Sequence, residues 1–160
     1  MLSVHLICVG KLKEKFYREA VEEYAKRLKG YCKLNLVEIP EVKLSQDPSL
    51  GEIQAALDKE GDAIRAKIPQ GSSIVAMCVE GKTRSSEELA QMVSAWSMNS
   101  AKHLVFVIGG SYGLHPSIKA EAWERLSMSP MTFPHHLARV MVLEQIYRAF
   151  KINEGSSYHK

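Results

Sequence analysis

Apolar and polar positions along the chain follow two periodicities. Short apolar runs at residues 3–9, 73–79 and 103–108 are typical of buried strands, and alternating apolar positions at 34–39 predict a further strand. Between these runs, apolar residues recur at the spacing of a helix face, as at Tyr17 and Val21. Strands that alternate with helices predict an α/β fold with a mostly parallel sheet.

Capping, proline and glycine signals predict the remaining elements. These are helices at 13–28, 53–68, 85–96, after Pro116 and at 137–151, and a short strand at 126–128. Ser85 and Glu88 have the spacing of a capping box, whereas Gly61 counts against the second helix. No repeat or long linker interrupts the pattern, so a single domain over residues 1–160 is expected.

Composition narrows the function classes only slightly. The formal net charge of +3 is compatible with a nucleic-acid partner, but a local basic patch would be needed. Cys8, Cys32 and Cys78 each lie in an apolar run, which favours small buried side chains over a disulfide or a metal site. Since no signal peptide or membrane span is apparent, a cytoplasmic protein is expected.

Two loops in the last third of the chain predict a ligand crevice. The apolar run 103–108 ends on a glycine-rich segment, 109–114, and a loop of small and sulfur-bearing residues at 126–136 precedes the last helix. Loops at the carboxyl ends of parallel strands form such crevices in open α/β sheets. The Gly-Gly-x-x-Gly pattern does not match the dinucleotide fingerprint, so NAD is not expected. A tight turn and a ligand wall explain these glycines equally well.

Several motifs, in order along the chain, resemble one family. They are Val9-Gly10-Lys11-Leu12-Lys13, Gly109-Gly110-Ser111-Tyr112-Gly113-Leu114, Met131-Thr132-Phe133-Pro134-His135, Glu144-Gln145-Ile146-Tyr147-Arg148 and the terminal Tyr158-His159-Lys160. The set resembles the bacterial methyltransferases of the SPOUT superfamily that modify N3 of a pseudouridine in large-subunit ribosomal RNA. The resemblance covers essentially the whole chain.

The resemblance implies S-adenosylmethionine as the cofactor. Gly109 would form one wall of its pocket, and Met77, at the end of the third strand, another. The loop before the last helix would line the cofactor through backbone groups and apolar surface. Its lining residues would be Met128, Ser129, Pro130, Met131, Thr132 and Phe133. Such a slot suits an adenine ring. Pro130 has no N–H, so a contact through that amide is not available.

The resemblance also implies catalytic residues near the end of the chain. Pseudouridine N3 must lose its imide proton, which a positioned base or a nearby cation would favour. His159 would act as the base or hold RNA, and Tyr158 and Arg139 are further catalytic candidates. His135 and His136 stand at a helix start, where the helix dipole disfavours a cationic imidazole, so structural roles are expected.

Three groups of basic residues are candidates for RNA contact. They are Lys11, Lys13, Lys15 and Arg18 with Phe16 and Tyr17 among them, then Lys82 and Arg84, and finally Arg139, Arg148 and Lys151 on the last helix. For the first group, phosphate contact with aromatic stacking and a solvated helix turn remain equal alternatives.

The last helix is apolar over most of its surface, which indicates burial in a homodimer. The resemblance implies the same dimer and a trefoil knot near the C-terminus. The expected substrate is 23S rRNA in the large subunit or the assembled 70S ribosome. Two alternatives remain: a SPOUT methyltransferase for another RNA nucleotide, and a catalytically silent module that binds the ribosome.

Overall fold

A computed structural model describes residues 1–99 and 102–160, and it contains a five-stranded sheet in the order β2-β1-β4-β3-β5. The strands are β1 (Ser3–Val9), β2 (Lys33–Ile39), β3 (Ser73–Thr83), β4 (His103–Ile108) and β5 (Glu124–Ser127). Every pairing between them is parallel. The predicted α/β class is therefore confirmed, and the sheet is wholly parallel.

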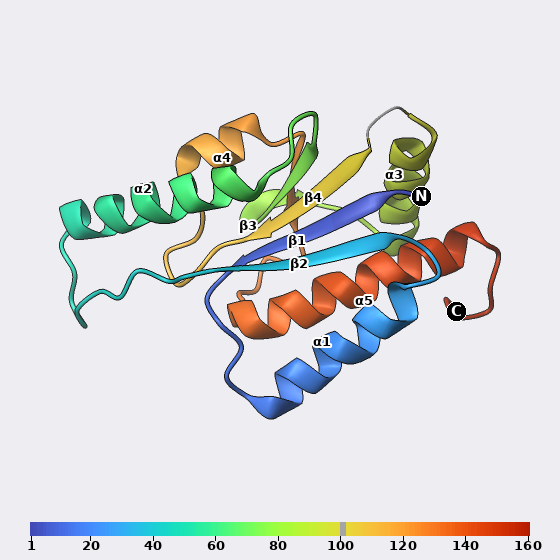
Figure 1. The fold of residues 1–160 in the computed structure, drawn as a ribbon, viewed down its shortest axis with the longest axis horizontal. Helices are drawn as coiled ribbons and strands as arrows, with labels where there is room; N and C mark the ends of the chain where they lie inside the picture. The colour runs from blue at the N-terminus through green and yellow to red at the C-terminus, as the bar shows by residue number, and fades with distance from the viewer. Residues whose placement is uncertain (100–101) are drawn as a thin grey trace.

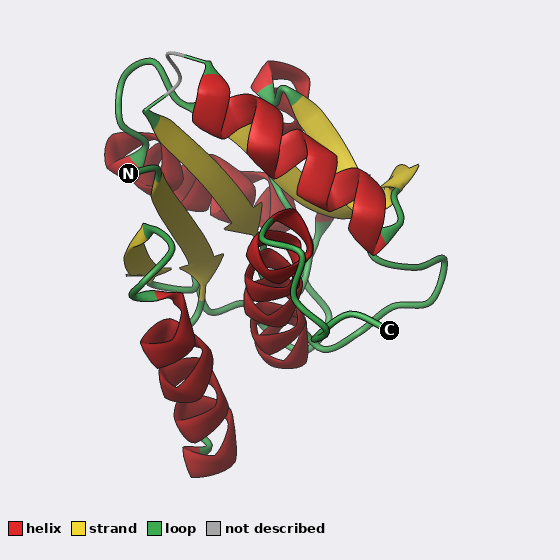
Figure 2. Ribbon diagram, turned by 90° about the vertical axis from the view of Figure 1, so that its right-hand side faces the viewer, coloured by secondary structure: helices red, strands yellow, loops and turns green. Residues whose placement is uncertain are grey.

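Helices cover both faces of the sheet (Figure 1). They are α1 (Lys15–Leu28), α2 (Leu50–Lys67), α3 (Ser86–Met98), α4 (Pro116–Glu121) and α5 (His135–Asn153). One face packs against α1, α3 and α5, and the other against α2 and α4. Figure 2, turned by a quarter, shows the helices on either side of the strands.

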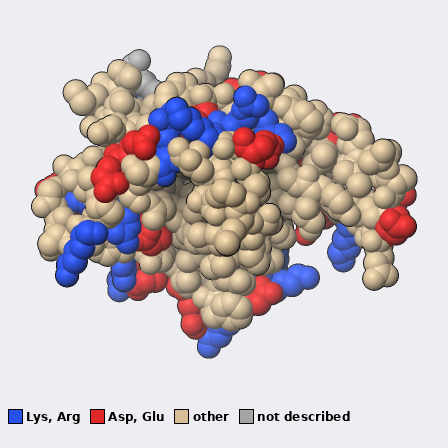
Figure 3. All heavy atoms as spheres, turned by 180° about the vertical axis from the view of Figure 1, so that it is seen from behind, with Lys and Arg blue, Asp and Glu red and all other residues tan. Residues whose placement is uncertain are grey.

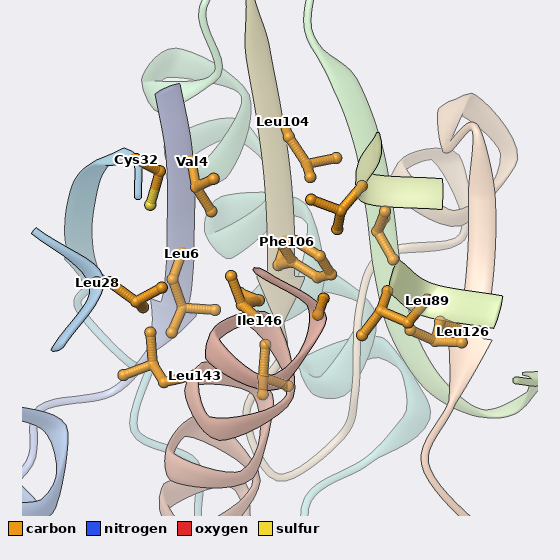
Figure 4. Packing of buried hydrophobic residues seen from close by; sticks show 14 of the residues in the cluster. Val4, Leu6, Leu28, Cys32, Leu89, Leu104, Phe106, Leu126, Leu143 and Ile146 are labelled. Atoms are coloured by element: carbon orange, nitrogen blue, oxygen red, sulfur yellow. The ribbon is translucent and has the colours of Figure 1, made fainter. Parts of the chain in front are cut away.

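The larger core lies between the sheet and the α1, α3 and α5 layer (Figure 4). Phe106 of β4 is fully buried there beside Leu143 and Ile146 of α5. Because β1 and β4 lie in the interior of the sheet, nearly all their residues are buried, as their continuous apolar runs require. In the edge strand β2, by contrast, only Ile39 is buried, and the other positions are half-buried or exposed.

Strands β3 and β5 and the middle of α2 differ from the sequence prediction. Strand β3 continues to Thr83 after a register shift between Met77 and Lys82, and β5 covers 124–127 instead of 126–128. Gly61 lies inside α2 without ending it. A Cβ at Gly61 would stand 3.2 Å from the Cβ of His115, so the glycine permits close packing against the start of α4.

The cysteines behave as the sequence predicted at two of three positions. Cys8 and Cys32 are buried, Cys78 is half-buried, and all three are free thiols. Burial raises the pKa of Cys8 to about 12 and that of Cys32 to about 11, so both stay neutral. Within the described parts of the chain, no helix combines the length and apolar character that crossing a membrane requires.

The parallel strands place several loops at a single edge of the sheet. The turn at Gly10 follows β1, the glycine loop 109–114 follows β4, and the loop 128–134 follows β5. This edge is where ligands bind in open α/β sheets.

Candidate functional site

A cavity of about 250 Å³ lies between β3, β5, α3 and α5. Its apolar walls are formed by Met77, Leu89, Phe106, Leu126, Met128, Met141 and Val142. Its polar lining includes Ser86 and Gln145, whose side chains share a hydrogen bond of 2.7 Å from Ser86 Oγ to Gln145 Oε1. This combination of apolar walls and few polar groups is typical of a small-molecule site.

A second cavity of about 100 Å³ adjoins the first and is lined by the loop after β5. The two cavities share Met77, Leu126, Ser127 and Met128. The smaller one adds four residues from the predicted cofactor loop, which are Ser129, Met131, Thr132 and Phe133. The structure therefore brings together six of the eight residues that the sequence assigned to the cofactor, and it leaves Pro130 and Gly109 outside both linings.

Two serine hydroxyls shape this loop. Ser127 Oγ donates to the Ser129 carbonyl at 3.0 Å, and the Met131 N–H donates to Ser129 Oγ at 3.0 Å. Among the described residues, no acceptor binds the N–H groups of Thr132 and Phe133. These two donors remain available to a ligand, whereas the Met131 N–H is already used and Pro130 has none.

The glycine loop closes on itself. Gly110 and Gly113 form an isolated β-bridge, and the Gly113 N–H donates to the Gly110 carbonyl at 3.0 Å. A Cβ at Gly109 would collide with the carbonyl group of Gly113, and Gly113 itself has φ +79°. The tight turn thus accounts for the glycine at 109, whose contact with the cofactor stays a prediction. Since Gly109 is buried, that contact would involve its backbone.

Arg139 of α5 is outside the linings of both cavities. Its Nη1 is 2.7 Å from Glu38 Oε2, and its Nη2 donates to the Gly10 carbonyl at 3.0 Å. Glu38 Oε2 also accepts from the Leu12 N–H at 3.0 Å. Burial opposes ionisation of Glu38, but these donors outweigh it and lower its pKa. Arg139 therefore joins α5 to β2 and the turn after β1, and the structure does not bring it to Tyr158 or His159.

The C-terminal residues are anchored across α3 and α5. Tyr158 Oη donates to Glu144 at 3.2 Å, and the Arg148 guanidinium lies 4.8 Å from the centre of the Tyr158 ring. His159 Nδ1 is 3.0 Å from Arg148 Nη1, and its Nε2 is 2.7 Å from Glu87 Oε1. Because arginine can only donate, Nδ1 must be the acceptor, and the proton of the ring lies on Nε2 toward Glu87.

The tail and the larger cavity share the seam between α3 and α5. Glu87 and Glu144, which hold the tail, are the sequence neighbours of Ser86 and Gln145, which line the cavity. Sequence reasoning assigned no role to Ser86 or Gln145. The capping box at Ser85, which the structure confirms, marked the helix start that presents Ser86, but it gave no sign of a ligand site.

His135 and His136 pack against the turn after β1. His135 Nε2 has no partner among the described residues, and burial, followed by the charge of His136, lowers the pKa of His135. His136 lies 3.7 Å from Glu14, just before α1. The structural roles expected for the two histidines stay a prediction.

A family model described as "Predicted SPOUT methyltransferase" matches residues 2–159. This match identifies the class of the protein as the SPOUT methyltransferases. Similar proteins named "Ribosomal RNA large subunit methyltransferase H" include those of Clostridium acetobutylicum, 46% identical, and Clostridioides difficile, 43% identical. Each alignment covers 99% of this chain and 100% of the relative. The chain belongs to the SPOUT methyltransferases, within the family of the ribosomal RNA large subunit methyltransferase H proteins.

This membership confirms the resemblance drawn from the sequence motifs. A solved structure, that of a probable methylase family protein from Haemophilus influenzae Rd KW20, is similar with a TM-score of 0.53. The match covers 99% of this chain and 70% of that one at 13% identity, so it concerns the fold alone.

Proposed function

We propose that this protein is an S-adenosylmethionine-dependent methyltransferase that methylates N3 of a pseudouridine in 23S rRNA. The observation that carries the proposal is the pair of adjoining cavities at the carboxyl ends of β3 and β5, in a chain of this family. The relatives are named for large-subunit ribosomal RNA, which supports the same substrate here. We further propose that residues 1–160 act as one domain in the cytoplasm, where ribosomes are found.

The residues around the cavities fit this cofactor. Met77, Met128 and Phe133 offer apolar surface to an adenosine, and the unused N–H groups of Thr132 and Phe133 offer donors to a purine edge. Ser129 shapes the loop through its hydroxyl, and Gly109 would contribute backbone from the neighbouring turn. When bound, the cofactor supplies an electrophilic methyl group, so the protein must mainly align the two reactants and exclude water.

We assign removal of the N3 proton and stacking on the target nucleobase to the C-terminal tail, residues 158–160. Tyr158 offers a ring for stacking on the target base, and His159 offers an imidazole beside it. In the anchored tail both ring nitrogens of His159 are engaged, so action as a base requires that the Arg148 contact open first. The contacts of Arg139 support a positioning role rather than a chemical one.

We also propose a homodimer and a C-terminal trefoil knot, both implied by the family. Half-buried apolar side chains remain along α5 after it has packed on α1 and α3, at Leu137, Val140, Met141 and Tyr147. A partner subunit would cover such a surface.

The direct test is methyl transfer from labelled cofactor to 70S ribosomes that contain or lack the target pseudouridine. We expect transfer only to ribosomes with pseudouridine, and the label should map to N3. Equal labelling of both ribosome preparations would indicate a methyltransferase for another nucleotide. Absence of transfer together with absence of cofactor binding in calorimetry would indicate a silent ribosome-binding module.

A further inference from the structure

A third cavity, of about 270 Å³, lies between α1 and the edge strand β2, away from the cofactor cavities. Its apolar walls include Leu12, Val21 and Leu36, and its polar lining includes Lys11 and Arg18. The volume is just below the range of about 300–1,000 Å³ that is typical for drug-sized ligands. This size suits a single flat ring better than a whole nucleotide.

A buried cation contributes to the lining of this cavity. Arg139 is only 4% exposed, yet it is among the lining residues. Its two terminal nitrogens bind Glu38 and Gly10, whereas its Nε has no partner among the described residues. An unpaired buried donor costs free energy unless a ligand or water satisfies it. The cavity therefore has a buried cation in its wall, beside the basic side chains of its rim.

Three of the four cations in the α1 group form no ion pair within the described residues, whereas Lys15 lies 3.6 Å from Glu19. In the part of the chain that the structure describes, Lys11, Lys13 and Arg18 form no ion pair, and Arg18 binds only the Lys13 carbonyl, at 2.6 Å. Two carboxylates also line the cavity, but Glu38 is taken up by Arg139, which leaves Glu22 against Lys11 and Arg18. The rim thus has an excess of positive charge.

The other two basic groups are largely paired. Arg84 binds Glu124 and Glu88, Arg148 binds Glu144, and Lys151 binds Glu154. Figure 3 shows the face opposite to that of Figure 1, where Lys and Arg atoms surround a broad uncharged area and Asp and Glu atoms lie beside some of them. Paired cations have less charge to offer to phosphates, so the α1 group is the strongest candidate.

An exposed aromatic side chain lies among the free cations. Phe16 is 63% exposed, and its ring centre lies 4.4 Å from that of Tyr17. A large apolar side chain held in solvent beside cations is the arrangement on which single-stranded nucleic acids stack. The position also suits the chemistry, since α1 begins at the same sheet edge as the cofactor loop. Glu14 and His136 join the start of α1 to the start of α5.

We propose that the α1 groove, formed by Lys11, Lys13, Phe16, Arg18 and the cavity above Arg139, binds a single-stranded segment of RNA. Lys11, Lys13 and Arg18 contact phosphates, Phe16 stacks on one base, and an adjacent base enters the cavity beside Arg139. The inference rests on the proposed function for the identity of the RNA as ribosomal. The physical prediction, RNA binding at this groove, is measured without methyl transfer.

The test uses fluorescence anisotropy with a short labelled single-stranded oligoribonucleotide, at about 50 to 200 mM salt. The probe variant is Lys11→Gln, Lys13→Gln, Arg18→Gln. Each lost phosphate contact lowers the salt slope of log affinity by about 0.7 for single strands, so the slope should fall by about 2. Phe16→Ala should weaken binding about tenfold at fixed salt, with an unchanged slope.

The matched control is Lys43→Gln, Lys59→Gln, Lys67→Gln. These lysines are exposed, lie in α2 or just before it, and form no ion pair within the described residues. The control removes the same net charge as the probe variant. Because these lysines lie outside the α1 groove, their loss should leave the salt slope nearly unchanged. Equal effects of both triple variants would overturn the proposal in favour of diffuse electrostatics. Competition by polyglutamate as strong as by RNA would overturn it in favour of an acidic protein partner.

Two further readouts separate this inference from the proposed function. Cofactor affinity and melting temperature should match the wild type in Phe16→Ala and in both triple variants. If wild-type protein methylates ribosomes but the α1 variants bind RNA with an unchanged slope, the groove is wrong and the function stands. If the slope falls as expected but wild-type protein methylates no ribosome, the groove stands and the function is wrong.

Discussion

Arg139→Met tests whether this buried arginine holds the fold together or takes part in the chemistry. Its side chain is 5% exposed, and its guanidinium binds Glu38 at 2.7 Å and the Gly10 carbonyl at 3.0 Å. Methionine fills a similar volume with an unbranched apolar chain, so the change removes charge and hydrogen bonds without a large void.

The expected change in the free energy of unfolding follows from the hydrogen bonds that Arg139→Met removes and the hydration that Glu38 recovers. Two charge-assisted hydrogen bonds disappear, each worth roughly 1.5–3 kcal/mol. Part of this is offset, because the Glu38 side chain is 44% exposed and recovers hydration. We expect the free energy of unfolding to fall by about 2–3 kcal/mol. For a chain of this size, that loss lowers the melting temperature by about 4–12 °C.

The assay is urea unfolding at fixed protein concentration, with methyl transfer measured well below the unfolding midpoint. Concentration is held constant because a dimer's stability depends on it. Glu38→Gln and the double variant complete a cycle, in which we expect a coupling of about 1 kcal/mol between the two side chains. A variant of wild-type stability that transfers no methyl would refute this reasoning and assign Arg139 a direct catalytic role.

Three further changes test the site and the fold. Gly109→Ala should destabilise the protein by about 1–3 kcal/mol, because its Cβ meets the Gly113 carbonyl. Gly30→Ala is the control, since a Cβ there meets nothing within 4 Å, and equal stability of the two variants would contradict the turn geometry. Burial, then the charges of His103 and Lys33, lower the pKa of His5 below 6.5. The unfolded chain therefore binds more protons in acid, so this stability is complete above about pH 6.5 and is lost as pH falls through the folded pKa. His5→Asn should flatten that decline in urea midpoints, and an unchanged decline would exclude His5 as its source. Deletion of residues 158–160 should abolish methyl transfer yet leave cofactor affinity and dimerisation nearly unchanged, whereas wild-type methylation by the truncated protein would show the tail to be dispensable.

The sequence predicted most of the fold, because its patterns are local. Apolar runs located β1, β3 and β4, alternation located β2, and the capping box at Ser85 located the start of α3. The same pattern at Ser49 and Glu52 marks the start of α2, which begins at Leu50, before the predicted residue 53. Gly61 counted against the second helix in the sequence, yet it lies inside α2. The reason for a glycine there is close packing against His115, which is distant in the chain.

The candidate site was predictable only as a set of residues. The family resemblance supplied six of the residues that line the two cavities, but spacing could not show that Arg139 contacts Glu38 and Gly10 outside them. Likewise, the anchoring of His159 depends on Glu87, which is 72 positions away. Such pairings arise from packing α3 against α5, and no local pattern records them.

Helix α5 contributes side chains to two different sites of the proposed enzyme. Met141, Val142 and Gln145 face the larger cofactor cavity, whereas Arg139 faces the α1 groove. The lining residues of the groove and of the two cofactor cavities do not overlap, so a base held in the groove lies apart from a methyl donor bound in the same chain. The groove therefore grips RNA that flanks the target, and the reacting base must approach elsewhere along the same edge of the sheet. Changes in the groove should then weaken ribosome binding while the rate at saturating ribosome stays near that of the wild type. Changes to the tail should lower that rate even when every ribosome is bound.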